Sequence, residues 1–599
     1  MHPRHFALAL ALLSSAAATQ QVSGTWFTTR GVLELQGDGA ELTGTYGDDQ
    51  GHRLTGTLRG NAFTFDATEG ATKLKGTFEF DASGHRFSGE WKAGRRSDTW
   101  RGWRHDPATE KGERAQVAGF WRTSWGLLEL TQEGDQLTGG FGAQGWSSVQ
   151  GTIAGRFVQL DYQNPFGKGS FTIDVDADGK RGLGGARGAT QGAWPLVLQR
   201  LDGATRAVAP KAGSIECGLG RNRLVYWLHA PKTWRAGQAL PLLVFLHGSN
   251  YASRPYVETI AQSEFGERCF VVGIDGEAWL DSSEPGDPRQ NYTYVNFMGK
   301  STYEGYPHTD RESPALVAEL LADLQQQLGS TRTFVGGHSQ GGFLTWFLAM
   351  HYPELVHGVF PMASGMVMQC EPDVFADAAL RARQRKVAIA VVHAPNDPVV
   401  RFAQGEASWR SCVEQGFPTL RLFQNRAGHM FAGLPWRDAV RWLEDMTSGD
   451  AAVLLRLANQ AIDEKRWRDA VAAITRLRSL EPVPDETKAL AQRVDDAAKA
   501  DAAKFLAAVR QPGDGAWIDA FLAFRDDFEF ADCCQELRTE FAALRAQHDE
   551  PAKRLLGEAR GLFQKGERDA GWKKYEALAK ECWASRSYPS VKRWLADRR

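Results

Sequence analysis

The sequence predicts a multidomain chain with two repeated antiparallel β modules, then a mostly parallel sheet with helices on both faces, then an all-helical, repeat-like region. Three observations predict this: an internal repeat in the first 201 residues, a change from alternating to continuous apolar segments near residue 215, and helical periodicity after residue 450. A chain of 599 residues is also too long for one hydrophobic core. We expect a signal segment at 1–18, β modules at 20–105 and 115–201, the α/β domain at 215–446 and the helical region at 450–599.

The first 18 residues have the pattern of an export signal. Arg4 gives a modest positive start, Phe6 to Leu13 is apolar, and Ala16 to Ala18 offer small residues for cleavage. The alternative is a frayed N-terminal helix. The apolar segment is too short to span a bilayer, and no later stretch reaches about 20 consecutive apolar residues. We therefore expect an exported protein, periplasmic or secreted, without a membrane span.

An internal repeat organises the N-terminal third of the chain. Val22 to Gly47 aligns without gaps to Val117 to Gly142, with 13 of 26 positions identical at an offset of 95 residues. Short segments of alternating apolar and polar residues, separated by turns, predict antiparallel meanders or small barrels. The tryptophans of this region favour a β core over an exposed platform for sugar or polymer: Trp26, Trp91, Trp100, Trp103, Trp121, Trp125, Trp146 and Trp194.

Charge and cysteine content give no support to several classes of function. The formal net charge of -2 offers no case for nucleic acid or an anionic membrane as partner. The seven cysteines have no spacing suited to zinc, so we expect no metal site. Export would permit a disulfide, for example within the α/β domain between Cys370 and Cys412, but the sequence cannot pair them.

From about residue 215, apolar segments lose their alternation, as expected for buried parallel strands with helices between them. The strand-like segments include Leu242 to Leu246, Thr333 to Val335, Val387 to Val392 and Leu420 to Phe423, and the helical ones include Pro314 to Leu328 and Phe343 to His351.

After residue 450 the apolar residues follow helical spacing. Two amphipathic helices joined by a short turn resemble a tetratricopeptide unit at 454–477, and a second unit is expected at 552–579. Because two units are fewer than a free-standing array needs, we expect them to pack on the preceding domain or on additional helices. These helices are also our candidate surface for a protein partner.

The sharpest chemical signal is the segment Gly337-His338-Ser339-Gln340-Gly341-Gly342, between a predicted strand and a predicted helix. Glycines beside a serine permit a sharp strand-to-helix turn that presents the hydroxyl at the carboxyl end of the sheet. We therefore predict Ser339 as a nucleophile and the backbone N–H of Gln340 as an oxyanion donor. The alternative is a glycine-rich turn with an inert serine.

Three other predicted loops, one before Ser339 and two after it, supply the groups that such a nucleophile needs. His247-Gly248-Ser249 follows a strand, which predicts a second oxyanion donor at Ser249 or Gly248 and a structural role for His247. Asp397 follows the strand Val387 to Val392 and is the predicted orienting carboxylate, with Asp373 as the fallback acid. His429 lies in the loop after the last strand and is the predicted general base.

Together, Leu-His-Gly, Gly-His-Ser-Gln-Gly-Gly, Asn-Asp-Pro-Val-Val and Ala-Gly-His resemble the α/β-hydrolase superfamily over residues 215–446. The most similar branch is the phospholipase/carboxylesterase, feruloyl-esterase and polyhydroxybutyrate-depolymerase-like group. This resemblance implies ester hydrolysis through an acyl-enzyme on Ser339, without metal or organic cofactor. It does not extend to the flanking modules.

A long connection at 277–311 is rich in aromatic and amide side chains, which is typical of loops that shape a substrate site. We predict substrate contacts by Trp279, Tyr292 and Tyr294, and by His338 beside the nucleophile. Hydroxyl and amide groups beside aromatic rings favour a sugar- or phenol-bearing ester, although simple loop packing explains them equally well.

The expected function is therefore an exported serine esterase acting on a small or polymer-linked carboxylic ester. Two alternatives are a serine peptidase of the prolyl-oligopeptidase type, which shares the order of the three residues, and a non-catalytic scaffold. The β modules do not look like propeller blades, which argues against the first, and the complete set of catalytic residue types argues against the second.

Overall fold

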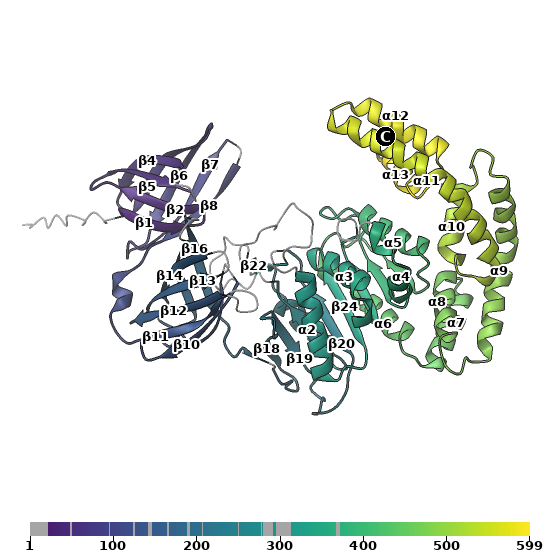
Figure 1. Cartoon of the computed structure of the whole chain (residues 1–599), viewed down its shortest axis with the longest axis horizontal. Coiled ribbons are helices and arrows are strands. Elements are labelled where there is room, and N and C mark those ends of the chain that lie inside the picture. Colours follow the sequence, from purple (N-terminus) through teal and green to yellow (C-terminus); the bar gives the residue numbers. More distant parts are fainter. Residues whose placement is uncertain are drawn as a thin grey trace, which may run out of the picture. The chain divides into compact units, whose positions relative to one another are not determined.

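The structure is a computed structural model that describes residues 22–47, 51–94, 96–123, 126–141, 147–164, 167–188, 192–206, 208–249, 251–276, 278–279, 292–294, 313–366 and 372–598. The chain divides into two compact units. The first contains both β modules, and the second contains the α/β domain and the C-terminal helices (Figure 1). The predicted signal segment lies outside the described residues.

The first β module is a closed antiparallel barrel of eight described strands. Alternation turns one side of each strand inward, and Trp26, Phe63, Phe78 and Trp100 fill the interior completely buried. The strands are β1 (Gly24–Thr28), β2 (Gly31–Gln36), β3 (Glu41–Tyr46), β4 (His52–Arg59), β5 (Ala62–Glu69), β6 (Thr72–Phe80), β7 (Arg86–Ala93) and β8 (Arg96–Trp103).

The second module is also a closed antiparallel barrel of eight described strands, and it repeats the contacts of the first. Trp26 Nε1 donates to the Val22 carbonyl at 2.9 Å, and Trp121 Nε1 donates to the Val117 carbonyl at 2.8 Å. The sequence repeat thus reflects a repeated structure. The strands are β9 (Gly119–Thr123), β10 (Gly126–Glu133), β11 (Gln136–Phe141), β12 (Ser147–Ala154), β13 (Phe157–Asn164), β14 (Gly167–Val175), β15 (Arg181–Gly188) and β16 (Gly192–Arg200).

The two barrels pack against each other within their unit. The Trp103 indole N–H donates to the Gly184 carbonyl at 2.7 Å, and Arg86 forms an ion pair with Asp176 at 3.0 Å. Phe27, Val32 and Trp103 of the first barrel form one apolar cluster with Leu183 and Val197 of the second.

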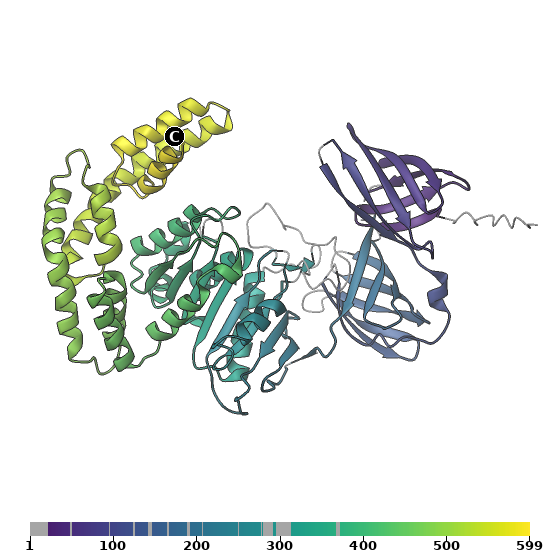
Figure 2. The same ribbon diagram turned by 180° about the vertical axis from the view of Figure 1, so that it is seen from behind.

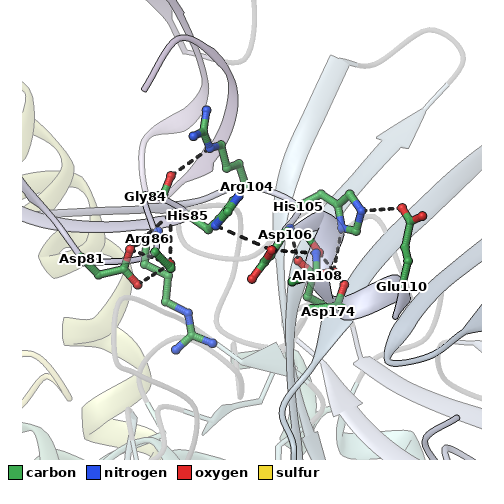
Figure 3. A network of polar contacts seen from close by, with 12 residues as sticks. Asp81, Gly84, His85, Arg86, Arg104, His105, Asp106, Ala108, Glu110 and Asp174 are labelled. Atoms are coloured by element: carbon green, nitrogen blue, oxygen red, sulfur yellow. Dashed lines mark hydrogen bonds and ion pairs between the residues drawn. The ribbon is translucent and has the colours of Figure 1, made fainter. Parts of the chain in front are cut away.

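A polar network continues this junction into the segment between the barrels (Figure 3). The Asp174 carboxylate accepts hydrogen bonds from His105 Nδ1, Thr109 Oγ1 and the Asp106 backbone N–H, each at 2.7 Å. His105 Nε2 lies 2.8 Å from Glu110 Oε1. The connecting segment is therefore fixed to the second barrel by the half-buried Asp174 carboxylate, which has several hydrogen-bond partners.

The α/β domain contains a sheet of nine described strands in the order β17-β18-β19-β21-β20-β24-β25-β26-β27. The strands from β21 to β27 pair in parallel, whereas β19 is antiparallel to both of its neighbours. The bounds are β17 (Thr205–Arg206), β18 (Ile215–Leu219), β19 (Val225–His229), β20 (Leu242–Leu246), β21 (Phe270–Ile274), β24 (Thr333–His338), β25 (Gly358–Met362), β26 (Ala388–Val392) and β27 (Leu420–Phe423).

The central strands are buried because helices cover the sheet. Helix α3 packs on β20, β24 and β25, and α1 and α6 share one apolar cluster with Leu243 and Phe245 of β20. The helices are α1 (Arg254–Ala261), α2 (Ser313–Leu328), α3 (Gln340–His351), α4 (Ala378–Gln384), α5 (Phe402–Glu414) and α6 (Trp436–Met446); two short strands, β22 (Ala278–Trp279) and β23 (Tyr292–Thr293), belong to the long connection.

The C-terminal region is helical, and Figure 2 shows its paired helices from behind. Its apolar residues join the same cluster that contains Trp442 and Leu443 of α6, so this region packs both on the α/β domain and on additional helices. The tetratricopeptide assignment itself stays a prediction. The helices are α7 (Ala451–Asp463), α8 (Trp467–Leu477), α9 (Glu486–Arg510), α10 (Ile518–Phe528), α11 (Gln535–Gln564), α12 (Arg568–Glu581) and α13 (Tyr588–Asp597).

The predicted fold class is confirmed: two closed barrels, then a mostly parallel sheet with helices, then a helical region. The modules are barrels rather than propeller blades. Of the tryptophans in this region, Trp26, Trp100 and Trp121 are buried in the barrels, whereas Trp125 and Trp146 lie outside the described residues. Among the described residues, no helix combines the length and apolar character needed to cross a membrane.

Candidate active site

Ser339 occupies a sharp turn between β24 and α3. Its backbone has φ 54° and ψ −116°, a conformation that costs a non-glycine residue about 1–3 kcal/mol. The Ser339 N–H donates to the Met362 carbonyl of the neighbouring strand β25 at 3.0 Å, and the Ser339 carbonyl accepts from Phe343 N–H at 3.0 Å. The side chain is half-buried. Sheet and helix together hold the serine in this strained conformation at the carboxyl end of the sheet.

The glycines of the motif are required by close backbone approach. A Cβ atom at Gly341 would lie 2.1 Å from the Leu246 carbonyl oxygen, and one at Gly337 would lie 2.3 Å from the Gly341 carbonyl oxygen. Both distances are too short for a side chain. Helix α3 therefore begins tightly against the end of β20, which brings the loop after β20 next to Ser339.

Asp397 and His429 meet although 32 residues separate them. Asp397 Oδ2 lies 2.8 Å from His429 Nδ1, and Asp397 Oδ1 accepts from the backbone N–H groups of Val399 and Val400 at 2.8 and 2.9 Å. The Asp397 side chain is completely buried, while the His429 side chain is 19% exposed. Because a carboxylate only accepts, His429 Nδ1 carries the proton and its Nε2 is an acceptor in the neutral ring.

His338 lies against His429 rather than in an open site. His338 Nε2 is 2.6 Å from the His429 carbonyl oxygen, so it must be the donor. Burial, together with the nearby His429, lowers the pKa of His338 to about 4. The ring is thus neutral near pH 7 and supports the backbone of His429. The structure shows this supporting contact for His338, and its predicted substrate contact stays a prediction.

The loop after β20 passes directly beside Ser339. A Cβ atom at Gly248 would lie 3.3 Å from His338 Nδ1 and 3.5 Å from Ser339 Cβ. Ser249 follows in a turn and is half-buried. His247 is completely buried; its Nδ1 donates to the Gly248 carbonyl at 2.6 Å and its Nε2 accepts from Gly276 N–H at 2.9 Å. These bonds fix the loop in which the second oxyanion donor is predicted.

Gln340 and Tyr294 together support the same region. Gln340 is buried at the first position of α3, and its side-chain amide exchanges hydrogen bonds of 3.2 and 3.1 Å with the Tyr294 backbone. Tyr294 is completely buried; its hydroxyl donates to the Ile274 carbonyl at 2.7 Å and accepts from His247 N–H at 3.1 Å. This position gives Tyr294 a supporting role beneath the loop, and its predicted substrate contact stays a prediction.

The other predicted contacts fall where side chains are not described. Trp279 lies in β22 and Tyr292 in β23, and the side chains of both are outside the described residues. The same holds for the side chain of Asp373, the fallback acid, whose backbone is in the short helix Pro372–Phe375.

Sequence reasoning missed His393, which follows β26 and precedes Asp397 by four residues. His393 is completely buried, its Nε2 lies 2.9 Å from the Val400 carbonyl oxygen, and the same nitrogen is 3.5 Å from Asp397 Oδ2. Burial lowers the pKa of His393. A neutral donor thus closes the turn that holds Asp397. The available signal was a histidine directly after a buried strand, but a lone histidine does not indicate this role.

Comparisons with known proteins concern the α/β domain. Residues 241–388 match the family model described as the alpha/beta hydrolase fold. No curated protein matches the sequence. Among solved structures, the chain is similar to esterase PE8 (19% identity, 37% of this chain and 96% of that chain, TM-score 0.27). It is also similar to acyl-protein thioesterase 2 of Zea mays (16% identity, 36% of this chain and 96% of that chain, TM-score 0.28). A ferulic acid esterase is similar as well (14% identity, 37% of this chain and 90% of that chain, TM-score 0.27).

The matched residues include β20, β24 with its turn to α3, and β25, which are the elements that surround Ser339. With the mostly parallel sheet and its covering helices, the domain that carries Ser339 therefore has the alpha/beta hydrolase fold.

Proposed function

We propose that this protein is an exported serine hydrolase that cleaves carboxylic esters through an acyl-enzyme on Ser339. The observation that carries the proposal is the 2.8 Å contact between Asp397 Oδ2 and His429 Nδ1, at the same end of the sheet as the strained Ser339 turn. The order serine, acid, histidine along the chain is that of this fold.

In the proposed reaction, His429 Nε2 takes the Ser339 Oγ proton while Oγ attacks the ester carbonyl carbon. The C–O bond to the alcohol then breaks, and His429 returns the proton to the departing alkoxide. Water repeats the same steps on the acyl-enzyme and releases the carboxylic acid. Asp397 keeps the proton on Nδ1 and stabilises the imidazolium that forms.

The tetrahedral intermediate carries a negative oxygen, for which we propose the backbone N–H groups of Gln340 and of Ser249 or Gly248. Two observations support this assignment: Gln340 begins α3, and the Gly248 loop passes beside Ser339. One such donor is worth about 2.7–4 kcal/mol in the transition state.

The test is hydrolysis of p-nitrophenyl acetate and methyl ferulate by the full chain and by Ser339→Ala. The matched control is Ser330→Ala, since Ser330 lies near the opposite end of β24. We expect turnover by the wild type and the control and none by Ser339→Ala. Hydrolysis that survives in Ser339→Ala would show that another group reacts.

The two alternatives have less support. A peptidase of the prolyl-oligopeptidase type would carry a propeller, and the N-terminal modules are closed barrels. A non-catalytic scaffold has no need of a strained serine beside a buried carboxylate–imidazole pair.

Export, supported by the first 18 residues, is tested by the N-terminal sequence of protein recovered outside the inner membrane. A protein partner at the C-terminal helices stays a prediction.

A further inference from the structure

Large apolar side chains of the described residues are mostly buried, and four are exposed: Tyr251 (46%), Val399 (67%), Met430 (66%) and Val483 (47%). One exposed apolar residue needs no explanation, but a group of them on one surface marks a binding site. Val483 lies between α8 and α9. The other three lie on the loops that follow β20, β26 and β27, which are the loops of the candidate active site.

Each of the three is next to a residue of the proposed machinery. Tyr251 follows Ser249 by two positions in the proposed oxyanion loop. Val399 donates its backbone N–H to Asp397 Oδ1 at 2.8 Å. Met430 directly follows His429, which contacts Asp397 Oδ2 at 2.8 Å. The three exposed residues therefore lie on the same loops as the groups that would act on the ester.

Packed aromatic rings hold two of these loops together. The Tyr251 ring centroid is 6.0 Å from that of Tyr256, which is 5.0 Å from that of Phe431, the neighbour of Met430. Phe431 also lies 5.1 Å from Phe245 of β20. Because Tyr256 and Phe245 are buried, the loops that carry Tyr251 and Met430 rest on a fixed base. An apolar surface of this kind is formed before a ligand arrives.

We infer that Tyr251, Val399 and Met430 form an apolar rim that binds a hydrophobic part of the ester substrate, an alkyl or aryl group. This inference rests on the proposed function and narrows its substrate class to esters with an alkyl or aryl group. A sugar is disfavoured, because its hydroxyls would find few hydrogen-bond partners among these three side chains. Burial of apolar surface drives such binding, and each methylene that becomes fully buried changes the binding constant by about fourfold.

The test compares p-nitrophenyl acetate, butyrate, hexanoate and octanoate, and a parallel series of acetate esters of methyl, butyl, hexyl and benzyl alcohols. The double variant Val399→Ser/Met430→Ser and the single variant Tyr251→Ser are measured beside the wild type. Val483→Ser is the matched control, because Val483 is an exposed apolar residue between α8 and α9, away from the loops of the site.

We expect wild-type kcat/KM to rise with chain length in at least one series. In the responding series, the rim variants should lose more kcat/KM as the chain becomes longer. The loss on the six-carbon ester should be at least about tenfold greater than the loss on the shortest ester, mainly through a higher KM. Val483→Ser should match the wild type. The series that responds identifies the side of the ester that the rim contacts.

If kcat/KM depends on chain length in the same way in the rim variants and the wild type, for both series, the inference is overturned. The proposed function would remain intact. Rates of labelling by ethyl and decyl fluorophosphonates give a second readout that does not need turnover. Labelling of wild type without preference for the longer chain would also overturn the rim. A folded wild type that neither hydrolyses esters nor becomes labelled would overturn the proposed function and the rim together.

Discussion

Three imidazoles near Asp397 differ in role because each has different partners. His429 contacts the carboxylate through Nδ1, His338 donates to the His429 carbonyl, and His393 donates to the Val400 carbonyl. Only His429 has a partly exposed side chain next to a buried carboxylate. Geometry at single atoms thus selects His429 as the proposed base and leaves the other two as positioning residues.

Replacing Asp397 by Asn removes the acceptor that fixes the His429 tautomer. An amide can donate to His429 Nδ1 instead, which would move the ring proton to Nε2 and block uptake of the serine proton. We expect kcat for p-nitrophenyl acetate to fall by about 10³- to 10⁴-fold with little change in KM. Near wild-type kcat in the folded variant would exclude Asp397 as the orienting acid.

The buried His338 makes stability depend on pH. Its folded pKa of about 4 is below the ordinary value of 6.5, so the unfolded state takes up a proton first as pH falls. The stability contribution is fully present above about pH 6.5 and declines down to about pH 4. His338→Gln keeps a donor for the His429 carbonyl and cannot titrate.

Between pH 7 and 5 we therefore expect wild type to lose about 2 kcal/mol more free energy of unfolding than His338→Gln. Denaturant titrations at both pH values measure this difference. Equal losses in the two proteins would mean that His338 is not kept neutral by its environment. Burial also lowers the pKa of His393, but this residue is present in both proteins, so its contribution cancels in the comparison.

At the scale of elements, local patterns predicted most strands and helices but not how they close or begin. The alternation of the repeat predicted strands but did not distinguish an open meander from a closed barrel. Closure depends on the pairing of β1 with β8, in which Phe27 lies opposite Trp103. The helix predicted from Phe343 begins at Gln340. Gly341 and Gly342 disfavour a helix locally, and only their packing against β20 and β25 keeps them in one.

Thr28 connects the two ends of the first barrel. Its hydroxyl accepts from the buried Trp100 indole N–H at 2.8 Å and from the Arg30 backbone N–H at 3.0 Å, and it donates to the Gly31 carbonyl at 2.7 Å. Thr28→Val keeps the shape and removes all three hydrogen bonds, so we expect the free energy of unfolding to fall by about 1–3 kcal/mol. Denaturation followed by tryptophan fluorescence measures it. The exposed Thr55 of β4 gives the control, and an equal effect of Thr55→Val would contradict this explanation.

At the scale of the whole molecule, Ser339, Asp397 and His429 could be placed from the sequence because each follows a recognisable buried strand. The apolar rim could not be predicted, because exposure of Val399 and Met430 depends on how three distant loops meet. Residues 450–599 were predicted to be helical, but the bounds of α9 and α10 could not be assigned from the sequence. Local patterns also cannot show a long-range contact such as the ion pair of Arg410 in α5 with Asp526 in α10, at 3.2 Å.

Arg468 of α8 illustrates how the C-terminal helices attach to the α/β domain. Its guanidinium donates to the Leu420 carbonyl of β27 at 3.1 Å and to the Asp526 carbonyl of α10 at 3.0 Å. Burial lowers the pKa of Arg468 to about 10, so it stays charged near pH 7. The strand that it holds leads into the His429 loop.

Arg468→Ala leaves these carbonyls without their donor, and we expect the free energy of unfolding to fall by about 1.5–3 kcal/mol. Thermal melting compares this variant with Arg560→Ala, which changes an exposed arginine on α11. If the two variants melt at the same temperature, the C-terminal helices do not depend on this contact for their attachment.

The proposed function requires that Ser339 is a nucleophile activated by His429. Covalent labelling by a fluorophosphonate, followed by mass spectrometry of the peptides, measures this property at Ser339 itself. We expect an adduct on Ser339 in the wild type, none in Ser339→Ala, and labelling at least about a hundredfold slower in His429→Gln. Absence of an adduct on Ser339 in the folded wild type, or equal labelling rates in wild type and His429→Gln, would contradict it.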